Sequence, residues 1–149
     1  MKIGLGSDHA GLRLKTVIAA HLMEEGRQVL DFGTTSEAPC DYPEFARLVA
    51  EAVRDGQCEC GILVCATGVG MAICANKVRG VRAGACNDLY TARFSRLHND
   101  LNILCLGERV IGPGLALEIV RVWLDTPFEG GRHARRLDLI GALEDESIK

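Results

Sequence analysis

The sequence lacks three features that would point to a membrane, to nucleic acid or to a structural zinc ion. No apolar run among its 149 residues approaches the roughly 20 residues of a membrane-spanning helix, and its N-terminus has no signal-peptide pattern. The net charge of −3 gives no general affinity for nucleic acid or anionic membranes. Without a C-x-x-C pair, four zinc ligands at familiar spacing cannot be assembled. We therefore expect a cytoplasmic protein with no nucleic-acid partner, no membrane partner and no metal.

The composition is that of one globular domain. Hydrophobic residues make up 48% and charged residues 25% of the chain, and 149 residues are enough for one substantial core. The cysteine count is seven, which is odd, and in a reducing cytoplasm these side chains should be free thiols. We expect a single domain over residues 1–149.

Apolar runs and helical periodicities alternate along the chain. Strands are predicted at residues 2–6, 28–32, 62–64, 81–86 and 102–106. Helices are predicted at 12–25, 43–55, 69–78, from about 88 to 97, 113–125, and from about 133 onward. Five alternations without a linker or an internal repeat predict an α/β fold, a three-layer α/β/α sandwich around a five-stranded, parallel, Rossmann-like sheet.

Candidate site residues follow the predicted strands, because sites in such sheets lie at the carboxyl ends of the strands. The strongest candidate stretch is Cys65–Gly70, a thiol followed by a small-residue turn into a helix. Backbone N–H groups and the positive end of that helix favour an anion beside the thiol. The alternative is a small core cysteine followed by a tight connection.

Three further groups of residues allow two interpretations each. Asp8-His9 could bind substrate or handle protons, or Asp8 could only cap the next helix. His98-Asn99 could shuttle a proton, or form a polar turn. Arg132 and Arg136, four residues apart, could clamp a phosphate together with Arg109, or could lie on a solvated helix face.

A nucleotide-binding module on the same sheet is the alternative from another functional class. Gly4 and Gly6 begin a dinucleotide fingerprint, with Asp31 placed to bind the ribose. His9 stands where the third glycine belongs, and its imidazole would block the approach of a pyrophosphate. Gly68 and Gly70 are not followed by the Gly-Lys-Ser/Thr of a P-loop. The broken fingerprint therefore argues against a nucleotide site.

Taken together, the motifs resemble those of type B ribose-5-phosphate isomerases, in the wider ribose/galactose isomerase group. The resemblance runs from Lys2 to about Glu144. It is carried by seven motifs in order, Gly6–Gly11, Asp41–Pro43, Cys65–Gly70, Ala75–Lys77, His98–Asp100, Gly107–Val110 and Glu129–His133. One departure is Ala66, where the family usually has glycine, and alanine fits that turn only with a negative φ.

The resemblance implies interconversion of ribose 5-phosphate and ribulose 5-phosphate through an enediolate, without a cofactor, as in the pentose phosphate pathway. It implies Cys65 as the base, because Met71 stands where other members have a glutamate. It further implies His98 for ring opening, with Asp8 and Thr67 assisting proton transfers. The implied substrate-binding residues are His9, Tyr42, Ala66, Gly68, Val69, Gly70, Asn99, Arg109, Arg132 and Arg136.

The resemblance also implies a homodimer, or a homotetramer, with the site between subunits. We expect His98, Asn99 and Arg109 to enter the site from the second chain. Two alternatives within the family stay open: an isomerase of six-carbon sugar phosphates of the allose 6-phosphate or galactose 6-phosphate type, and an inactive subunit of a hetero-oligomeric enzyme. Cys65, Thr67, His98 and the arginines are all present, which favours a self-sufficient enzyme.

Overall fold

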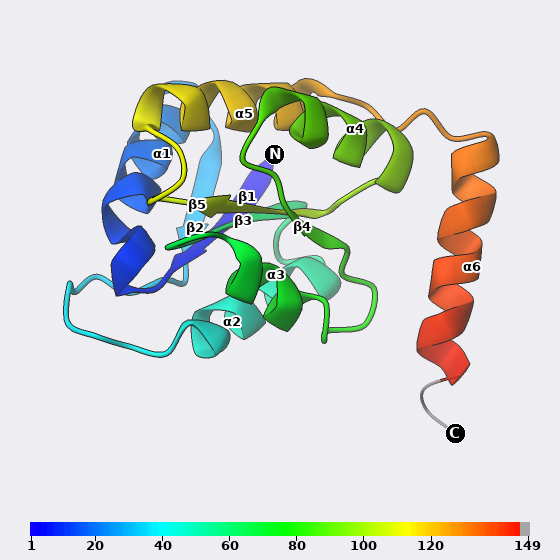
Figure 1. Ribbon diagram of the computed structural model, residues 1–149, viewed down its shortest axis with the longest axis horizontal. Helices are drawn as coiled ribbons and strands as arrows, with labels where there is room; N and C mark the ends of the chain where they lie inside the picture. Colours follow the sequence, from blue (N-terminus) through cyan, green and yellow to red (C-terminus); the bar gives the residue numbers. More distant parts are fainter. Residues whose placement is uncertain (147–149) are drawn as a thin grey trace.

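A five-stranded, all-parallel sheet forms the centre of the computed structural model, which describes residues 1–146 (Figure 1). The strands are β1 Lys2–Ser7, β2 Gln28–Asp31, β3 Cys60–Cys65, β4 Ala83–Ala85 and β5 Ile103–Gly107. Their order across the sheet is β2-β1-β3-β5-β4, and each neighbouring pair is parallel. The prediction of a five-stranded parallel α/β fold is confirmed.

Helices cover both faces of the sheet. They are η1 His9–Gly11, α1 Leu12–Glu24, α2 Tyr42–Arg54, α3 Val69–Ala75, α4 Leu89–Asn99, α5 Pro113–Asp125 and α6 Arg132–Glu146. Figure 1 shows α1, α4 and α5 on one face and α2 and α3 on the other, with α6 at the side of the body. Two apolar clusters fill the two interfaces, one on each face of the strands.

The alternation of strand side chains explains why the sheet is buried on both faces. In β3, Ile62 and Val64 pack under α1 and α5, whereas Leu63 and Cys65 pack against α2 and α3. All six residues of β3 are buried, as its uninterrupted apolar sequence predicts. Cys65 is thus the last residue of the central strand and faces the α2–α3 layer.

The strand order places a topological switch point between β1 and β3. The chain moves outward from β1 to β2 in one direction and from β3 to β5 and β4 in the other. Ligands bind at such a point, beyond the carboxyl ends of the strands. Asp8 directly follows β1 and Ala66 directly follows β3, so two of the candidate motifs meet there.

Two predicted elements are shorter in the structure, because asparagine side chains take over backbone pairing. The helix predicted to reach residue 78 ends at Ala75, and the next residue, Asn76, exchanges two hydrogen bonds with the backbone of Ala83, at 2.8 and 2.9 Å. The strand predicted from residue 81 begins at Ala83, since Asn102 Oδ1 accepts the Arg82 N–H at 2.8 Å. Conversely, α4 extends two residues beyond its predicted end and includes His98 and Asn99.

The last helix contacts the body mainly at its two ends. At its start, His133 packs on α4, and toward its end Asp145 pairs with Arg79 and Glu144 accepts the Gly80 N–H. Leu139 and Leu143, between these ends, are among the most exposed apolar residues. Within residues 1–146, no helix has both the length and the apolar character that crossing a bilayer requires.

Candidate functional site

The turn between β3 and α3 directs a backbone N–H at the Cys65 thiol. Gly68 N–H donates to Cys65 Sγ at 3.1 Å, a favourable contact for a thiolate. The turn requires a glycine at this position, because Gly68 has φ 84° and is the residue before α3. Cys65 itself is only 6% exposed, so its sulfur lies at the base of the turn rather than on its surface.

The departure at Ala66 does not disturb this turn. Asp100 is the non-glycine residue with a positive φ among residues 1–146, so Ala66 has the negative φ that an alanine requires. The neighbouring backbone is tightly packed: a Cβ on Gly107 would lie 2.8 Å from the backbone of Thr67. Glu108 N–H also donates to Cys65 O at 2.9 Å, which ties the end of β5 to the turn.

The loop after β1 packs directly against Cys65. A Cβ on Gly11 would lie 2.4 Å from Val64 O and 2.9 Å from Cys65 N, so only glycine allows this approach. Asp8 Oδ1 accepts the N–H groups of Ala10 and Gly11 at 3.0 and 3.1 Å, so Asp8 caps the short helix η1, whereas α1 begins after Gly11 without a side-chain cap. The buried Asp8 carboxylate is thereby fixed beside the thiol strand.

His9 and Tyr42 complete the rim of the turn. Cys40 N–H donates to His9 Nδ1 at 3.1 Å, so the proton of the neutral ring is on Nε2, where it can be donated to a ligand. The Tyr42 ring lies over Gly70, since a Cβ there would come within 2.8 Å of it. Arg109 N–H donates to Ala66 O at 3.1 Å. We call Cys65, His9, Tyr42 and Arg109 together the thiol group of the site.

His98 and Asn99 lie toward the amino ends of the strands, whereas the thiol group lies at their carboxyl ends. Asn87, just before α4, is beside the thiol group, because its amide donates to Thr67 O at 3.1 Å and accepts the Gly107 N–H at 2.8 Å. From there α4 runs back along the sheet, and its rise of 1.5 Å per residue places His98 about 14 Å further along the axis. One chain therefore does not bring His98 next to Cys65.

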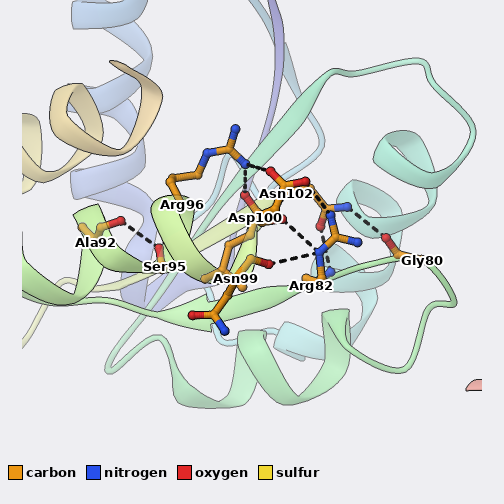
Figure 2. A network of polar contacts seen from close by, with 9 residues as sticks. Gly80, Arg82, Ala92, Ser95, Arg96, Asn99, Asp100 and Asn102 are labelled. Carbon is orange, nitrogen blue, oxygen red and sulfur yellow. Dashed lines mark hydrogen bonds and ion pairs between the residues drawn. The ribbon is translucent and has the colours of Figure 1, made fainter. Parts of the chain in front are cut away.

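An ion-pair network holds this end of α4 in place (Figure 2). Asp100 ends the helix with φ 43° and bonds Arg82 at 3.1 Å and Arg96 at 2.8 Å. The Arg82 guanidinium also donates to the carbonyl oxygens of Asn99 and Asp100, at 3.2 and 2.9 Å. The two arginines offset the unfavourable charge of an aspartate at a helix C-terminus and fix the residues before it.

His98 belongs to a compact cluster with Glu129 and His133. The two imidazole rings stack with centroids 4.0 Å apart and planes 9° apart, and Glu129 Oε2 lies 3.6 Å from His98 Nε2 and 3.7 Å from His133 Nε2. Among residues 1–146 this is the one group of three metal-ligating side chains with ligand atoms within 4.8 Å. The stacked rings hold their lone pairs in nearly parallel planes, whereas a tetrahedral ion requires them to converge.

Burial, together with nearby positive charges, lowers the pKa of His133. Removal from water lowers the pKa of His133, and His98, Arg132 and Arg136 lower it further, while Glu129 opposes them. Arg132 Nε donates to His133 Nε2 at 3.4 Å, so this nitrogen serves as an acceptor. Arg132 and Arg136 begin α6 and thus lie with His98, so the histidine group of the site comprises His98, Asn99, Arg132 and Arg136.

The structure corrects one grouping and adds two residues. Arg109 was expected beside His98 and Asn99, but its backbone bonds Ala66 and places it in the thiol group. Glu129 and His133 lie at the two ends of the last motif, and the sequence predicted no role for either. Their spacing of four residues across Gly130-Gly131, both with positive φ, was the signal that could have joined them.

Comparison with known proteins identifies the family of the chain. The family model described as Ribose/Galactose Isomerase matches residues 3–140. Ribose-5-phosphate isomerase B of Escherichia coli is 50% identical over 143 residues, which cover 96% of each chain. A ribose-5-phosphate isomerase B structure from Clostridium thermocellum is 54% identical, with a TM-score of 0.98 over 99% of each chain. D-erythrulose-4-phosphate isomerase of Pectobacterium atrosepticum is 44% identical over 98% of this chain and 97% of its own. The chain belongs to the ribose/galactose isomerase family.

Proposed function

We propose that this protein interconverts ribose 5-phosphate and ribulose 5-phosphate in the cytoplasm, with Cys65 as the base. The observation that carries the proposal is the Cys65 sulfur at the switch point, which accepts the Gly68 N–H at 3.1 Å beside the loop that holds Asp8 and His9. The family to which the chain belongs includes relatives named for this reaction.

Isomerisation requires one group that moves a proton between two adjacent carbons. The Cys65 thiolate removes the C2 proton of the open-chain aldose, and the same sulfur returns a proton to C1 of the enediolate to form the ketose. Met71 is fully buried and supplies no carboxylate, so the thiol is the base that this turn offers. The reaction so written needs neither a metal nor an organic cofactor.

The negative charge of the enediolate is stabilised by the turn after the thiol. Gly70 and Met71 lie in the first turn of α3, where the N–H groups have no helix carbonyl to donate to, and the Val69 N–H before them donates to Thr67 Oγ1 at 3.3 Å. The Thr67 hydroxyl and Asp8 assist proton transfer between the two substrate oxygens, and Asn99 adds a side-chain donor. Tyr42 lines the sugar pocket from its position over Gly70.

The substrate phosphate and the sugar ring require both groups of the site. His9 and Arg109 from the thiol group, with Arg132 and Arg136 from the histidine group, bind the phosphate through charge-assisted hydrogen bonds. His98 protonates the ring oxygen to open the furanose. The two groups lie at opposite ends of the strands. One chain therefore cannot bring both groups to the same substrate molecule.

We propose a homodimer, alone or within a tetramer, in which the thiol group of one chain meets the histidine group of the other. Exposed apolar side chains support this assembly, because Val69 and Ile73 beside the thiol group are 53% and 58% exposed, and Leu139 and Leu143 on α6 are 61% and 64% exposed. A two-fold axis would pair the two surfaces twice and create two identical sites.

A second candidate substrate class is that of four-carbon sugar phosphates. A relative 44% identical over nearly the whole chain is named for a four-carbon substrate, erythrulose 4-phosphate. The same thiol, turn and arginines would serve a substrate one carbon shorter, since the chemistry at C1 and C2 is unchanged. Six-carbon sugar phosphates remain the alternative within the family.

A coupled assay across four-, five- and six-carbon sugar phosphates tests the proposal. We expect the highest kcat/KM with ribose 5-phosphate and a loss of nearly all activity in Cys65→Ala, with Cys65→Ser little better because a hydroxyl is a far weaker base. Circular dichroism of both variants checks that they fold. Near wild-type turnover by folded Cys65→Ala would eliminate the thiol mechanism.

A further inference from the structure

Three side chains that do not themselves act in the proposed isomerisation hold His98 in place. His133 stacks on one face of its ring, Phe94 approaches at 4.9 Å with the ring planes 63° apart, and Glu129 Oε2 lies 3.6 Å from its Nε2. His98 remains 34% exposed, whereas His133 is 5% exposed. The histidine therefore has a packed back and one side open to a ligand.

The backbone around Glu129 directs its carboxylate at this ring. Glu129 N–H donates to Leu97 O at 3.0 Å, which fastens the residue to the last turn of α4. Gly130 and Gly131, with φ 71° and 56°, then reverse the chain, and His133 N–H donates to Gly130 O at 3.0 Å. This turn places a carboxylate and a second imidazole beside the same histidine.

Hydrogen-bond roles assign the Glu129 carboxylate to His98 rather than to His133. Arg132 donates to His133 Nε2, so that nitrogen is an acceptor and cannot also donate to a carboxylate. His98 Nε2 is the other nitrogen within reach of Glu129 Oε2. An N–H on His98 Nε2 then faces the carboxylate, and Nδ1 is the nitrogen left for a substrate. A carboxylate beside an imidazole in this way fixes its tautomer and stabilises its protonated form.

We propose that Glu129 is a positioning residue for ring opening, which holds His98 through its Nε2 so that Nδ1 faces the substrate; the inference rests on the proposed function. In that step the C1–O4 bond of the furanose breaks, O4 takes a proton from His98, and the C1 hydroxyl gives its proton to water as the aldehyde forms. His133, held neutral behind His98, adds no second positive charge to the pair.

The ketose provides a readout that bypasses ring opening. Ribulose 5-phosphate cannot form a furanose, because the oxygen on C5 carries the phosphate. Exchange of its C1 proton with deuterium from solvent reports enediolate formation by Cys65 without a ring-opening step. Turnover of ribose 5-phosphate, which is cyclic in solution, requires both steps.

The experiment compares Glu129→Gln, Glu129→Asp and the wild type in both assays, with Glu118→Gln on the exposed side of α5 as a matched control. We expect Glu129→Gln to lower kcat for ribose 5-phosphate by about ten-fold or more, with KM and deuterium exchange into ribulose 5-phosphate within about two-fold of wild type. Glu129→Asp, which keeps the charge, should recover part of the loss. Glu129 is 55% exposed, so Glu129→Gln should fold normally.

Three outcomes would overturn the inference. Unchanged turnover in Glu129→Gln would show that the carboxylate has no part in the reaction. Equal losses of turnover and exchange would assign Glu129 to the enediolate step or to the fold. If the wild type itself showed neither turnover nor exchange, the proposed function would fail first, and the inference with it.

Discussion

At the scale of single residues, the surroundings of each thiol separate the seven cysteines into two classes. Burial raises the pKa of Cys58, Cys86 and Cys105, and that of Cys60 to about 12. These four side chains are buried and stay protonated at neutral pH, so they are poor nucleophiles. Cys40 and Cys74 are partly exposed, and Cys65 accepts an N–H donor.

Thiol alkylation should therefore be selective. We expect iodoacetamide at pH 7 to modify Cys40, Cys65 and Cys74 well before the other four thiols, because Cys40 and Cys74 are partly exposed and the Cys65 sulfur accepts the Gly68 N–H, a contact that favours a reactive thiolate. Mass spectrometry of tryptic peptides follows each site. Sugar phosphate should slow modification of Cys65 alone, and inactivation should track that peptide. Inactivation that tracked Cys40 or Cys74 instead would contradict the assignment of Cys65.

The pH dependence of His133 is a second prediction at this scale. Because its pKa is lowered in the folded protein, the unfolded chain binds a proton that the folded chain does not, as pH falls below the ordinary histidine value of about 6.5. The stability that depends on neutral His133 is thus present above that pH and lost as pH falls toward the folded-state pKa.

Histidine NMR measures this directly. A pH titration of the ring protons, with the His133 signal assigned by its loss in His133→Asn, should give a pKa below the ordinary value. His133→Asn should also reduce the loss of unfolding free energy between pH 7 and pH 5. A His133 signal that titrates at or above the ordinary value would show that the ring is charged beside His98.

Sequence reasoning reached individual site residues where the chemistry is local. Cys65 and Gly68 are three residues apart, so one strand–turn–helix pattern was enough to predict backbone N–H groups beside the thiol, and the Gly68 N–H is one of them. The negative φ that Ala66 needs is likewise a local property, because it depends only on the turn in which Ala66 lies. Glu129 was missed because it meets His98 only through the fold: the two residues are far apart in sequence, and their contact depends on how α6 begins against α4.

At the scale of elements, the C-terminus of α4 is held by a left-handed residue and two ion pairs. Asp100 takes a left-handed conformation, which costs an ordinary residue about 1–2 kcal/mol, and its two ion pairs with Arg82 and Arg96 offset that strain. Both ion pairs are partly buried, at 23–31% side-chain exposure, so they are screened less than surface pairs.

Removing this carboxylate should destabilise the protein by a measurable amount. We expect Asp100→Ala to lower the free energy of unfolding by about 1–2 kcal/mol, and Asp100→Asn by less, because asparagine tolerates the left-handed conformation. Urea unfolding at fixed protein concentration measures both. Equal stability of Asp100→Ala and the wild type would show that neither the strain nor the ion pairs matter.

Element positions followed from the sequence, but several boundaries did not, and two of them depend on asparagine side chains. Strand and helix cores were set by apolar periodicity and by glycines after the helices, all of which are local signals. The ends of α3 and β4 depend instead on Asn76 and Asn102, whose amides bond the backbone 7 and 20 residues away. Propensity cannot distinguish such an asparagine from one in an ordinary turn.

At the scale of the whole molecule, strand order determines how the site is divided. The thiol group lies at the switch point between β1 and β3, at the carboxyl ends of the strands. Helix α4 places His98 toward their amino ends. Neither fact could be read from periodicity, because the same alternation of strands and helices fits several strand orders. The resemblance to the family supplied the expectation of a shared site, and the fold gives it a geometric reason.

A subunit-mixing experiment tests this division most directly. Cys65→Ala lacks the thiol group's base, and His98→Asn lacks the histidine group's acid, so each homodimer should be nearly inactive with ribose 5-phosphate. After equal amounts are mixed and exchange is verified by native mass spectrometry, half the dimers are hybrids with one intact site of two. We therefore expect recovery of about a quarter of wild-type activity. No recovery after verified exchange would contradict a site built from two chains.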